Sequence, residues 1–188
     1  MLGLDTNEQA KAAKAGNSEA FLRLLEGSKE RLYRIALAYL HQEADALDAV
    51  QEATCRAFQS LRKLKEPSHF ETWMVRIVLN ACADEYKKRR RRGPEAWLEK
   101  TGTAGIAGAA IAFSDASDTR VSLRQLVDGL PREQKEIIIL KYYQQLTVTE
   151  VAAVLECPEG TVKTRLHKAL VTLRGVLGEE GIHDFARA

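Results

Sequence analysis

The sequence predicts an all-α protein made of two small helical domains joined by a flexible linker. Apolar residues recur at spacings of three and four in both halves of the chain, whereas the period-two alternation of strands is almost absent. A segment rich in Gly, Ala, Ser and Thr, residues 93–119, separates the halves and is typical of a linker. With 188 residues, 45% hydrophobic and 29% charged, the chain can bury one medium core or two small ones.

The formal net charge of +2 conceals an uneven distribution. Residues 87–92 read Lys-Lys-Arg-Arg-Arg-Arg, so six of the 28 Lys and Arg residues form one run, the basic tract. By formal count, residues 1–92 carry +4, the linker −3 and residues 120–188 +1. The positive charge is therefore concentrated where the first domain is expected to end.

Several function classes are disfavoured by the sequence. Cys55, Cys82 and Cys157 are odd in number and far apart, which argues against a disulfide framework or a zinc knuckle and favours a reducing, intracellular setting. No signal peptide or membrane-spanning run is evident. The four histidines are scattered and no phosphate-binding or zinc-protease motif occurs, so we expect no enzyme, metal or cofactor.

The first domain, residues 1–92, is expected to contain at least four helices. Two short amphipathic helices are predicted, one beginning near Ala20 and one between Leu32 and Leu40. A helix over 43–61 has an apolar face, which we expect to be buried, and a polar face, which we expect to be exposed. The apolar face holds Leu47, Val50, Thr54, Phe58 and Leu61, and the polar face holds Asp45, Asp48, Glu52, Arg56 and Gln59, with Gln51 beside it.

A loop that contains Pro67 precedes the longest predicted helix, residues 70–92. Its expected core stripe is Phe70, Trp73, Met74, Ile77, Val78 and Ala81. Its other side presents Arg76, Asn80, Lys87 and Arg91 at helical spacing and ends in the basic tract. Cations and an amide beside aromatic residues suit a nucleic-acid backbone with unstacked bases. A run of cations alone also fits a nuclear address, a membrane-surface patch or a solvated helix end.

The second domain, residues 120–188, carries three helix signals in order. A helix opens at Pro131 and runs to Tyr143, and Thr147 to Glu150 forms a capping box ahead of a short helix ending at Leu155. After a turn, Pro158 begins a helix that reaches about Leu177. On the outer face of its first turns the side chains are small, hydroxylic or basic, which is typical of the recognition helix of a helix-turn-helix. The alternative is an ordinary solvated helix face.

Three segments resemble, in order, bacterial sigma-70 factors of the extracytoplasmic-function group. The first is Asp-Ala-Leu-Asp-Ala-Val-Gln-Glu-Ala at 45–53, and the second is Phe-Glu-Thr-Trp-Met-Val-Arg-Ile-Val-Leu-Asn at 70–80 with its basic extension. The third is Glu-Gly-Thr-Val-Lys-Thr-Arg-Leu-His-Lys-Ala at 159–169. The resemblance implies sigma region two at 1–92, a helical bundle, and sigma region four at 120–188, a helix-turn-helix.

The resemblance also implies roles for individual residues. A polar helix would bind the beta-prime clamp helices of core RNA polymerase; the matching positions are Asp45, Asp48, Gln51 and Glu52. Leu47 stands where the family often has an acid. Binding and melting of the minus-ten element would fall to Ser68, His69, Phe70, Arg76, Asn80, Lys87, Lys88 and Arg91. Duplex recognition of the minus-thirty-five element would fall to Glu159, Gly160, Thr161, Lys163, Thr164, Arg165, His167 and Lys168.

The function implied is that of a cytoplasmic transcription initiation factor without catalytic residues. Its implied partners are core RNA polymerase, through the clamp helices and the beta flap, promoter DNA and an anti-sigma factor; no small-molecule substrate or membrane insertion is expected. Two alternatives come from the residues alone. A helix-turn-helix regulator would bind a palindromic operator without polymerase, and a helical adaptor would bind nucleic acid without sequence preference.

Overall fold

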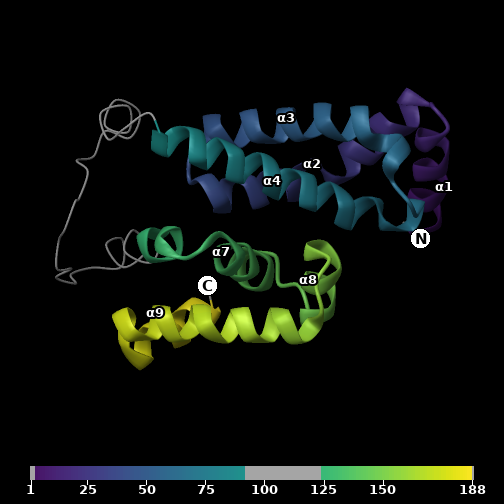
Figure 1. Ribbon diagram of the computed structural model, residues 1–188. Helices are drawn as coiled ribbons and strands as arrows, with labels where there is room; N and C mark the ends of the chain where they lie inside the picture. Colours follow the sequence, from purple (N-terminus) through teal and green to yellow (C-terminus); the bar gives the residue numbers. More distant parts are fainter. Residues whose placement is uncertain (1–2, 92–123, 188) are drawn as a thin grey trace. The chain divides into compact units, whose positions relative to one another are not determined.

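The computed structural model describes residues 3–91 and 124–187, and within these two ranges it contains helices and connections but no strand (Figure 1). The predicted all-α class is confirmed. The chain divides into two compact units, Met1–Glu85 with Ala152–Glu156, and Tyr86–Val151 with Cys157–Ala188. The predicted linker lies outside the described residues, and the domain boundaries at 92 and 120 remain predictions.

The N-terminal helices begin with α1 (Gly3–Lys14), which the sequence analysis did not predict. Helix α1 packs against α2 (Ser18–Leu40) and against the short 3-10 turns that follow α3. Between α1 and α2, Gly16 has a φ of 106°, a conformation that side chains rarely adopt. Asn17 then caps α2, because its side-chain oxygen accepts a hydrogen bond of 3.1 Å from the backbone N–H of Ala20.

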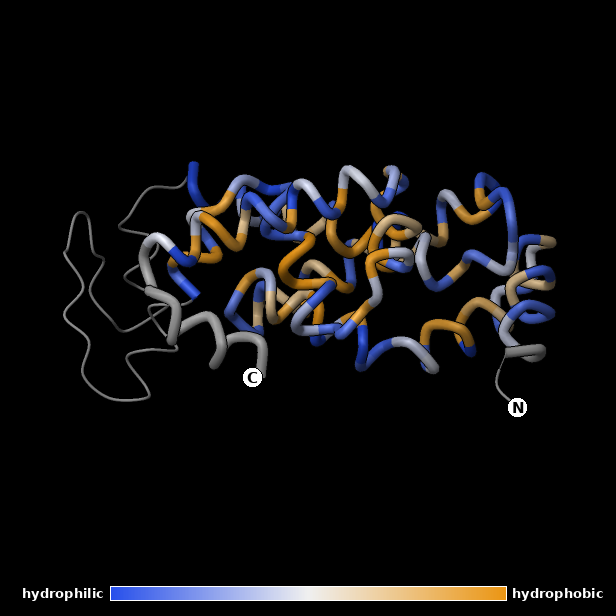
Figure 2. Tube along the Cα trace, turned by 90° about the horizontal axis from the view of Figure 1, so that it is seen from below, coloured by the Kyte–Doolittle hydropathy of each residue, from blue (hydrophilic) through white to orange (hydrophobic). Residues whose placement is uncertain are grey.

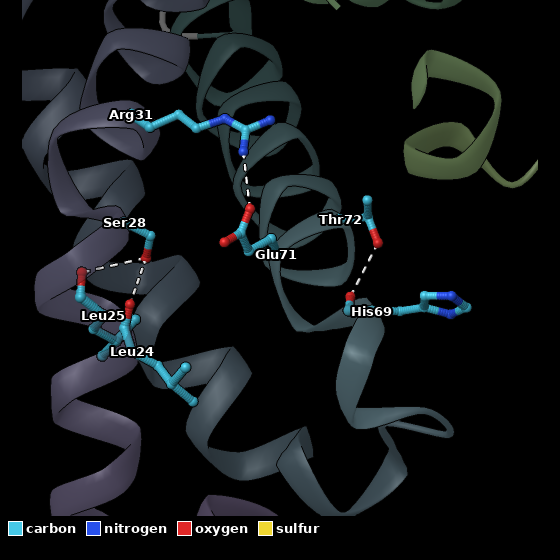
Figure 3. Close-up of polar contacts among 7 residues, drawn as sticks. All are labelled: Leu24, Leu25, Ser28, Arg31, His69, Glu71 and Thr72. Carbon is cyan, nitrogen blue, oxygen red and sulfur yellow. Dashed lines mark hydrogen bonds and ion pairs between the residues drawn. The ribbon is translucent and has the colours of Figure 1, made fainter. Parts of the chain in front are cut away.

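Helix α2 is one continuous helix, so the prediction of two short helices was wrong. Gly27 lies in its middle and was compatible with a break, but a single glycine weakens a helix without ending it. The hydroxyl of Ser28 donates to the carbonyls of Leu24 and Leu25, at 2.9 and 3.3 Å, and so stays within the helix (Figure 3). The helix ends at His41, whose left-handed backbone places its N–H 2.8 Å from the carbonyl oxygen of Leu37.

Helices α3 (Glu43–Ser60) and α4 (Phe70–Arg91) agree with the predicted ranges to within one residue at each end. The connection holds two 3-10 turns, η1 (Leu61–Lys63) and η2 (Pro67–His69), where an irregular loop was expected. Aromatic rings join the helices: the Phe21 ring lies 5.4 Å from that of Phe58 and 6.3 Å from that of Phe70, the latter edge to face.

The buried face of α3 differs from the predicted one. Ala46, Ala49, Ala53 and Ala57 face the core, whereas Leu47 and Phe58 are 58% and 55% exposed. The alanines recur at three and four and form a second apolar stripe, and their small side chains let α2 and α3 approach closely. Figure 2 shows hydrophobic and hydrophilic residues interleaved along the tube within single helices, as this amphipathic packing requires.

The C-terminal helices contain α7 (Arg132–Ile138), α8 (Val148–Leu155) and α9 (Glu159–Arg187). Helix α7 continues into a π-helical turn, η3 (Ile139–Tyr143), which the sequence did not indicate. Pro131 caps α7 instead of occupying its first turn. The residues that pack together come from a helical segment at 124–129, the bend that follows it, α7 and α9; they are Val127, Leu130, Ile138, Ala169 and Leu173.

Candidate nucleic-acid and polymerase interfaces

Helices α8 and α9 form the predicted helix-turn-helix. The capping box is present: the backbone N–H and the hydroxyl of Thr147 lie 2.8 and 2.7 Å from one carboxylate oxygen of Glu150, and the Glu150 N–H donates to that hydroxyl at 3.2 Å. The intervening turn is tight, since Glu156 has a φ of 48°. The Thr149 hydroxyl then donates to Glu159 at 2.7 Å and ties the two helices together.

Helix α9 begins one residue later than predicted. The carbonyl of Pro158 accepts hydrogen bonds from the N–H groups of Thr161 and Val162, at 2.9 and 3.2 Å, so Pro158 caps the helix and Glu159 is its first residue. The backbone of α9 extends to Arg187, about ten residues beyond the predicted end near Leu177. The hydrogen bonds to Pro158 fix the start of α9 in the turn, and the start is the part of a recognition helix that contacts base edges.

Most of the residues predicted to read the minus-thirty-five element are exposed on α9. Thr161 and Arg165 are half-buried, and a guanidinium nitrogen of Arg165 lies 2.7 Å from a carboxylate oxygen of Glu133. Val162 and Ala169 are buried, so the two faces of the helix are distinct. The exposed set is Glu159, Gly160, Lys163, Thr164, His167 and Lys168. It combines one carboxylate with cations, a hydroxyl and a glycine that permits close approach of the backbone.

The residues predicted for the minus-ten element lie on η2 and α4. Ser68, His69, Asn80, Lys87, Lys88 and Arg91 are exposed, and Arg76 is half-buried. Figure 3 shows the His69 ring directed away from the ribbon of its own helix, while its carbonyl accepts a 3.0 Å hydrogen bond from the Thr72 hydroxyl. An ion pair of 3.2 Å between Arg31 and Glu71 ties the start of α4 to α2.

Phe70 requires a correction. Its side chain is 1% exposed and packs against Phe21 and Trp73, so in this conformation it is a core residue and cannot contact a base. The helical spacing placed Phe70 both in the core stripe and beside the loop, and packing with α2 decides between these roles. Trp73, by contrast, is only half-buried.

The predicted polymerase-binding face of α3 also needs one correction. Asp48, Gln51 and Glu52 are exposed, but Asp45 is 5% exposed, so its carboxylate is inaccessible to a protein partner in this conformation. Rotation of the alanine stripe into the core carries Asp45 inward with it. We therefore remove Asp45 from the candidate docking residues.

Arg56 links this face to α4. Its guanidinium lies 2.7 Å from Glu52 on the same helix and 2.7 Å from Asp84 on α4. The hydrogen bonds to Asp84 and to Glu52 raise the pKa of Arg56, and the guanidinium holds the Glu52 carboxylate in place. Glu52 is thus positioned by an ion pair on its own helix.

The rotation of α3 places apolar side chains on the same exposed face. Leu47 precedes Gln51 by four residues and Phe58 follows it by seven, so on a helix all three lie on one side. We call Leu47, Asp48, Gln51, Glu52 and Phe58 the α3 face. Sequence reasoning assigned Leu47 and Phe58 to the core; the available signal was the alanine stripe, which offers an alternative buried face.

No metal centre or membrane helix is found in the described parts of the chain. Within 3–91 and 124–187, no three His, Cys, Asp or Glu side chains are grouped so that they could hold a metal ion. In the same ranges, no helix is long and apolar enough to cross a bilayer.

Family models match two segments of the chain. The model for sigma-70 region 2 matches residues 24–92, and the model for sigma-70, region 4, matches residues 120–173. The first match ends in the basic tract, and the second covers α7, α8 and the start of α9.

Known proteins resemble nearly the whole chain. The ECF RNA polymerase sigma factor SigW of Bacillus subtilis is 30% identical over 178 residues, which span 89% of this chain and 94% of that protein. The ECF RNA polymerase sigma-E factor of Escherichia coli K12 is 28% identical over 162 residues, spanning 82% and 84%. Among solved structures, CnrH in complex with the cytosolic domain of CnrY is 26% identical, with a TM-score of 0.65 over 92% of this chain and 97% of that one.

Proposed function

The chain belongs to the extracytoplasmic-function group of sigma-70 RNA polymerase sigma factors, which bind core RNA polymerase and direct it to promoters, and we propose which of its surfaces binds each partner. The observation that carries the proposal is the separation of exposed charge. The α3 face is acidic and apolar, whereas the end of α4 and the start of α9 are basic. Such surfaces suit a protein partner and DNA, respectively.

The α3 face is the proposed polymerase-binding surface. Asp48 and Glu52 would meet cations on the clamp helices of the beta-prime subunit, while Leu47 and Phe58 would supply the apolar area that protein interfaces bury at their centres. An acidic face of this kind repels phosphate, which argues against a DNA-binding role for α3.

Helix α4 with η2 is the proposed minus-ten surface. Ser68 and His69 lie in η2, directly before α4, and Arg76, Asn80, Lys87, Lys88 and Arg91 follow along α4. Side chains of this kind bind single-stranded backbone and displaced bases. Unstacking a base costs a few kcal/mol, and polymerase, by holding both DNA-binding domains on one promoter, would help to offset that cost.

Helix α9 is the proposed reader of the minus-thirty-five duplex. Its N-terminal turns, from Glu159 to Lys168, present the short and basic side chains that reach the major groove. We further propose that the chain acts in the cytoplasm without catalysing a reaction, and that an anti-sigma factor restrains it. The solved complex of CnrH with the cytosolic domain of CnrY shows that a similar protein binds a protein partner.

The test is reconstitution with bacterial core RNA polymerase. The purified chain should direct run-off transcription from a subset of a promoter library, and the double reversal Asp48→Lys with Glu52→Lys should lower its affinity for core polymerase. A matched control is Glu26→Lys with Glu30→Lys, two exposed acids of α2, which changes the net charge equally. Core affinity should be unchanged in the control.

Two outcomes would contradict the assignment. Equal core affinity of the α3 double reversal and of wild type would remove the α3 face from the polymerase interface. Tight binding of the chain alone to a palindromic operator, with no polymerase present, would indicate a conventional helix-turn-helix regulator.

A further inference from the structure

The recognition helix opens with an acidic residue on its exposed face. Glu159 is the first residue of α9, and the cations Lys163 and Lys168 follow it on the same helix. A carboxylate at this position is repelled by DNA phosphates, and in the major groove only the amino groups of cytosine and adenine can donate a hydrogen bond to it. Glu159 therefore favours DNA binding only if it meets one of these two bases.

The neighbours of Glu159 hold it in a defined position. The Thr149 hydroxyl on α8 donates to one carboxylate oxygen at 2.7 Å. The other oxygen lies 3.9 Å from the ammonium nitrogen of Lys163, one turn along α9. This ion pair is long and exposed, so it contributes little to stability and leaves both groups available to a ligand. An acceptor and a donor thus stand side by side on the recognition helix.

This arrangement complements the major-groove edge of a cytosine–guanine pair. Cytosine presents the N4 amino donor, guanine presents the O6 acceptor, and the hydrogen bond that joins them puts them about 2.9 Å apart. The Glu159 carboxylate can accept from cytosine N4 while the Lys163 ammonium donates to guanine O6. Guanine N7 offers the ammonium a second acceptor.

An adenine–thymine pair fits the same groups less well. Adenine N6 could donate to the carboxylate, but the neighbouring N7 acceptor would face the same negative charge. Thymine O4 could accept from the ammonium, but the C5 methyl group beside it is apolar and bulky. The two flanking groups both oppose binding, so the pair of side chains discriminates against adenine–thymine.

We propose that Glu159 and Lys163 together select a cytosine–guanine base pair in the minus-thirty-five element, with Thr149 as the residue that positions Glu159. This inference rests on the proposed function of α9 and adds the identity of one base pair. The selected cytosine and its guanine partner are read by two residues one helical turn apart.

The experiment is a selection from promoters with a randomised minus-thirty-five element, using holoenzyme assembled from core polymerase and each variant. Wild type should require cytosine–guanine at one position. Glu159→Ala and Lys163→Ala should each reduce the preference at that same position, by about tenfold for a contact of the usual strength. Thr149→Val should weaken it less, because the carboxylate remains but is no longer held.

Glu159→Gln gives a second, sharper readout. Glutamine bonds adenine through N6 and N7, so this variant should move the preferred base at that position from cytosine to adenine. A residue that only stabilises the start of α9 would change affinity for all promoters alike and would not alter the preferred base. Glu30→Gln is the matched control: Glu30 forms an exposed ion pair with Arg34, four residues further along its helix, and this variant should select the wild-type element.

Two results would overturn the inference. One is that Glu159→Ala selects the same bases as wild type at every position, and the other is that Glu159→Ala and Lys163→Ala relax different base pairs. Failure of the proposed function is distinguishable, because wild type would then show no base preference in the minus-thirty-five element and Lys168→Ala would leave promoter binding unchanged.

Discussion

Three non-glycine residues in the described parts of the chain adopt a left-handed backbone, and each lies where one helix ends or turns into the next. They are His41, Gln145 and Glu156, with φ of 60°, 53° and 48°. The left-handed region costs an ordinary residue roughly 1–2 kcal/mol because Cβ crowds the following carbonyl. Glycine would adopt these angles without that cost, so replacing one of these residues by glycine should relieve strain.

We predict that Gln145→Gly raises the free energy of unfolding by up to about 1 kcal/mol, because it relieves the left-handed strain. Gln144→Gly is the matched control: its φ is −104°, so glycine there only adds freedom to the unfolded chain and should lower stability. Urea unfolding of the full chain, followed by circular dichroism, measures both. Equal changes in the free energy of unfolding in the two variants would show that the left-handed backbone of Gln145 costs no stability.

At the scale of elements, two features decide where the binding surfaces point. The alanine stripe of α3 sets which side chains of that helix reach solvent, and the capping box of α8 sets where the helix-turn-helix starts. Both patterns are visible in the sequence, but only the capping box could be predicted from the sequence together with the structure that it forms. Its reciprocal hydrogen bonds involve residues three apart, whereas the stripe requires a partner helix.

For α3, the structure predicts opposite effects at its two apolar faces. Ala53 is fully buried, so Ala53→Leu should overpack the core and lower the free energy of unfolding by about 1–3 kcal/mol. Leu47 is mostly exposed, so Leu47→Ala should change stability by less than about 0.5 kcal/mol while weakening binding to core polymerase. Chemical denaturation and a polymerase-binding assay separate these effects; marked destabilisation by Leu47→Ala would place that residue in the core.

For α8, Thr147→Ala removes the hydroxyl that accepts from Glu150 and should cost about 1 kcal/mol. Thr172→Ala is the matched control, because the Thr172 hydroxyl only donates to a carbonyl of its own helix, that of Lys168. It should be close to neutral, since alanine has the higher helix propensity. Thermal unfolding compares the two variants. A midpoint temperature of Thr147→Ala equal to that of wild type would exclude a stabilising role for the capping box.

At the scale of the whole molecule, a net charge of +2 is the sum of surfaces with opposite signs. The basic tract and α9 carry positive potential, and the α3 face carries negative charge. The two proposed DNA-binding surfaces lie in separate predicted domains, so we expect tight promoter binding only when core polymerase holds both on one DNA molecule. The chain alone should bind the same promoter weakly.

The number of phosphate contacts made by the basic tract is measurable from salt dependence. Replacing Lys87, Lys88 and Arg91 by alanine should reduce the slope of log K against log salt for the holoenzyme, by roughly 0.7 to 0.9 for each cation that contacts phosphate. The control removes Lys11, Lys29 and Arg34, three exposed cations of α1 and α2. An identical slope in both triple variants would mean that the tract is a solvated helix end.

The positions of most helices could be predicted from the sequence alone. The ranges of α3 and α4, the capping box at Thr147 and the helix-turn-helix follow from apolar periodicity, caps and prolines, which act within a few residues of the chain. The three family motifs lie on these elements. For the same reason, Lys168 was correctly placed on the outer face of α9, whereas Arg165 is half-buried.

Only the tertiary structure decided which face of α3 is buried. The sequence of α3 offers two apolar stripes, and close packing of its alanines against α2 selects one, which buries Asp45 and exposes Leu47. Packing against Phe21 likewise places Phe70 in the core. Local periodicity determines that a helix forms and is amphipathic; the shape of its neighbours determines its rotation, because burial depends on contacts between residues distant in the chain.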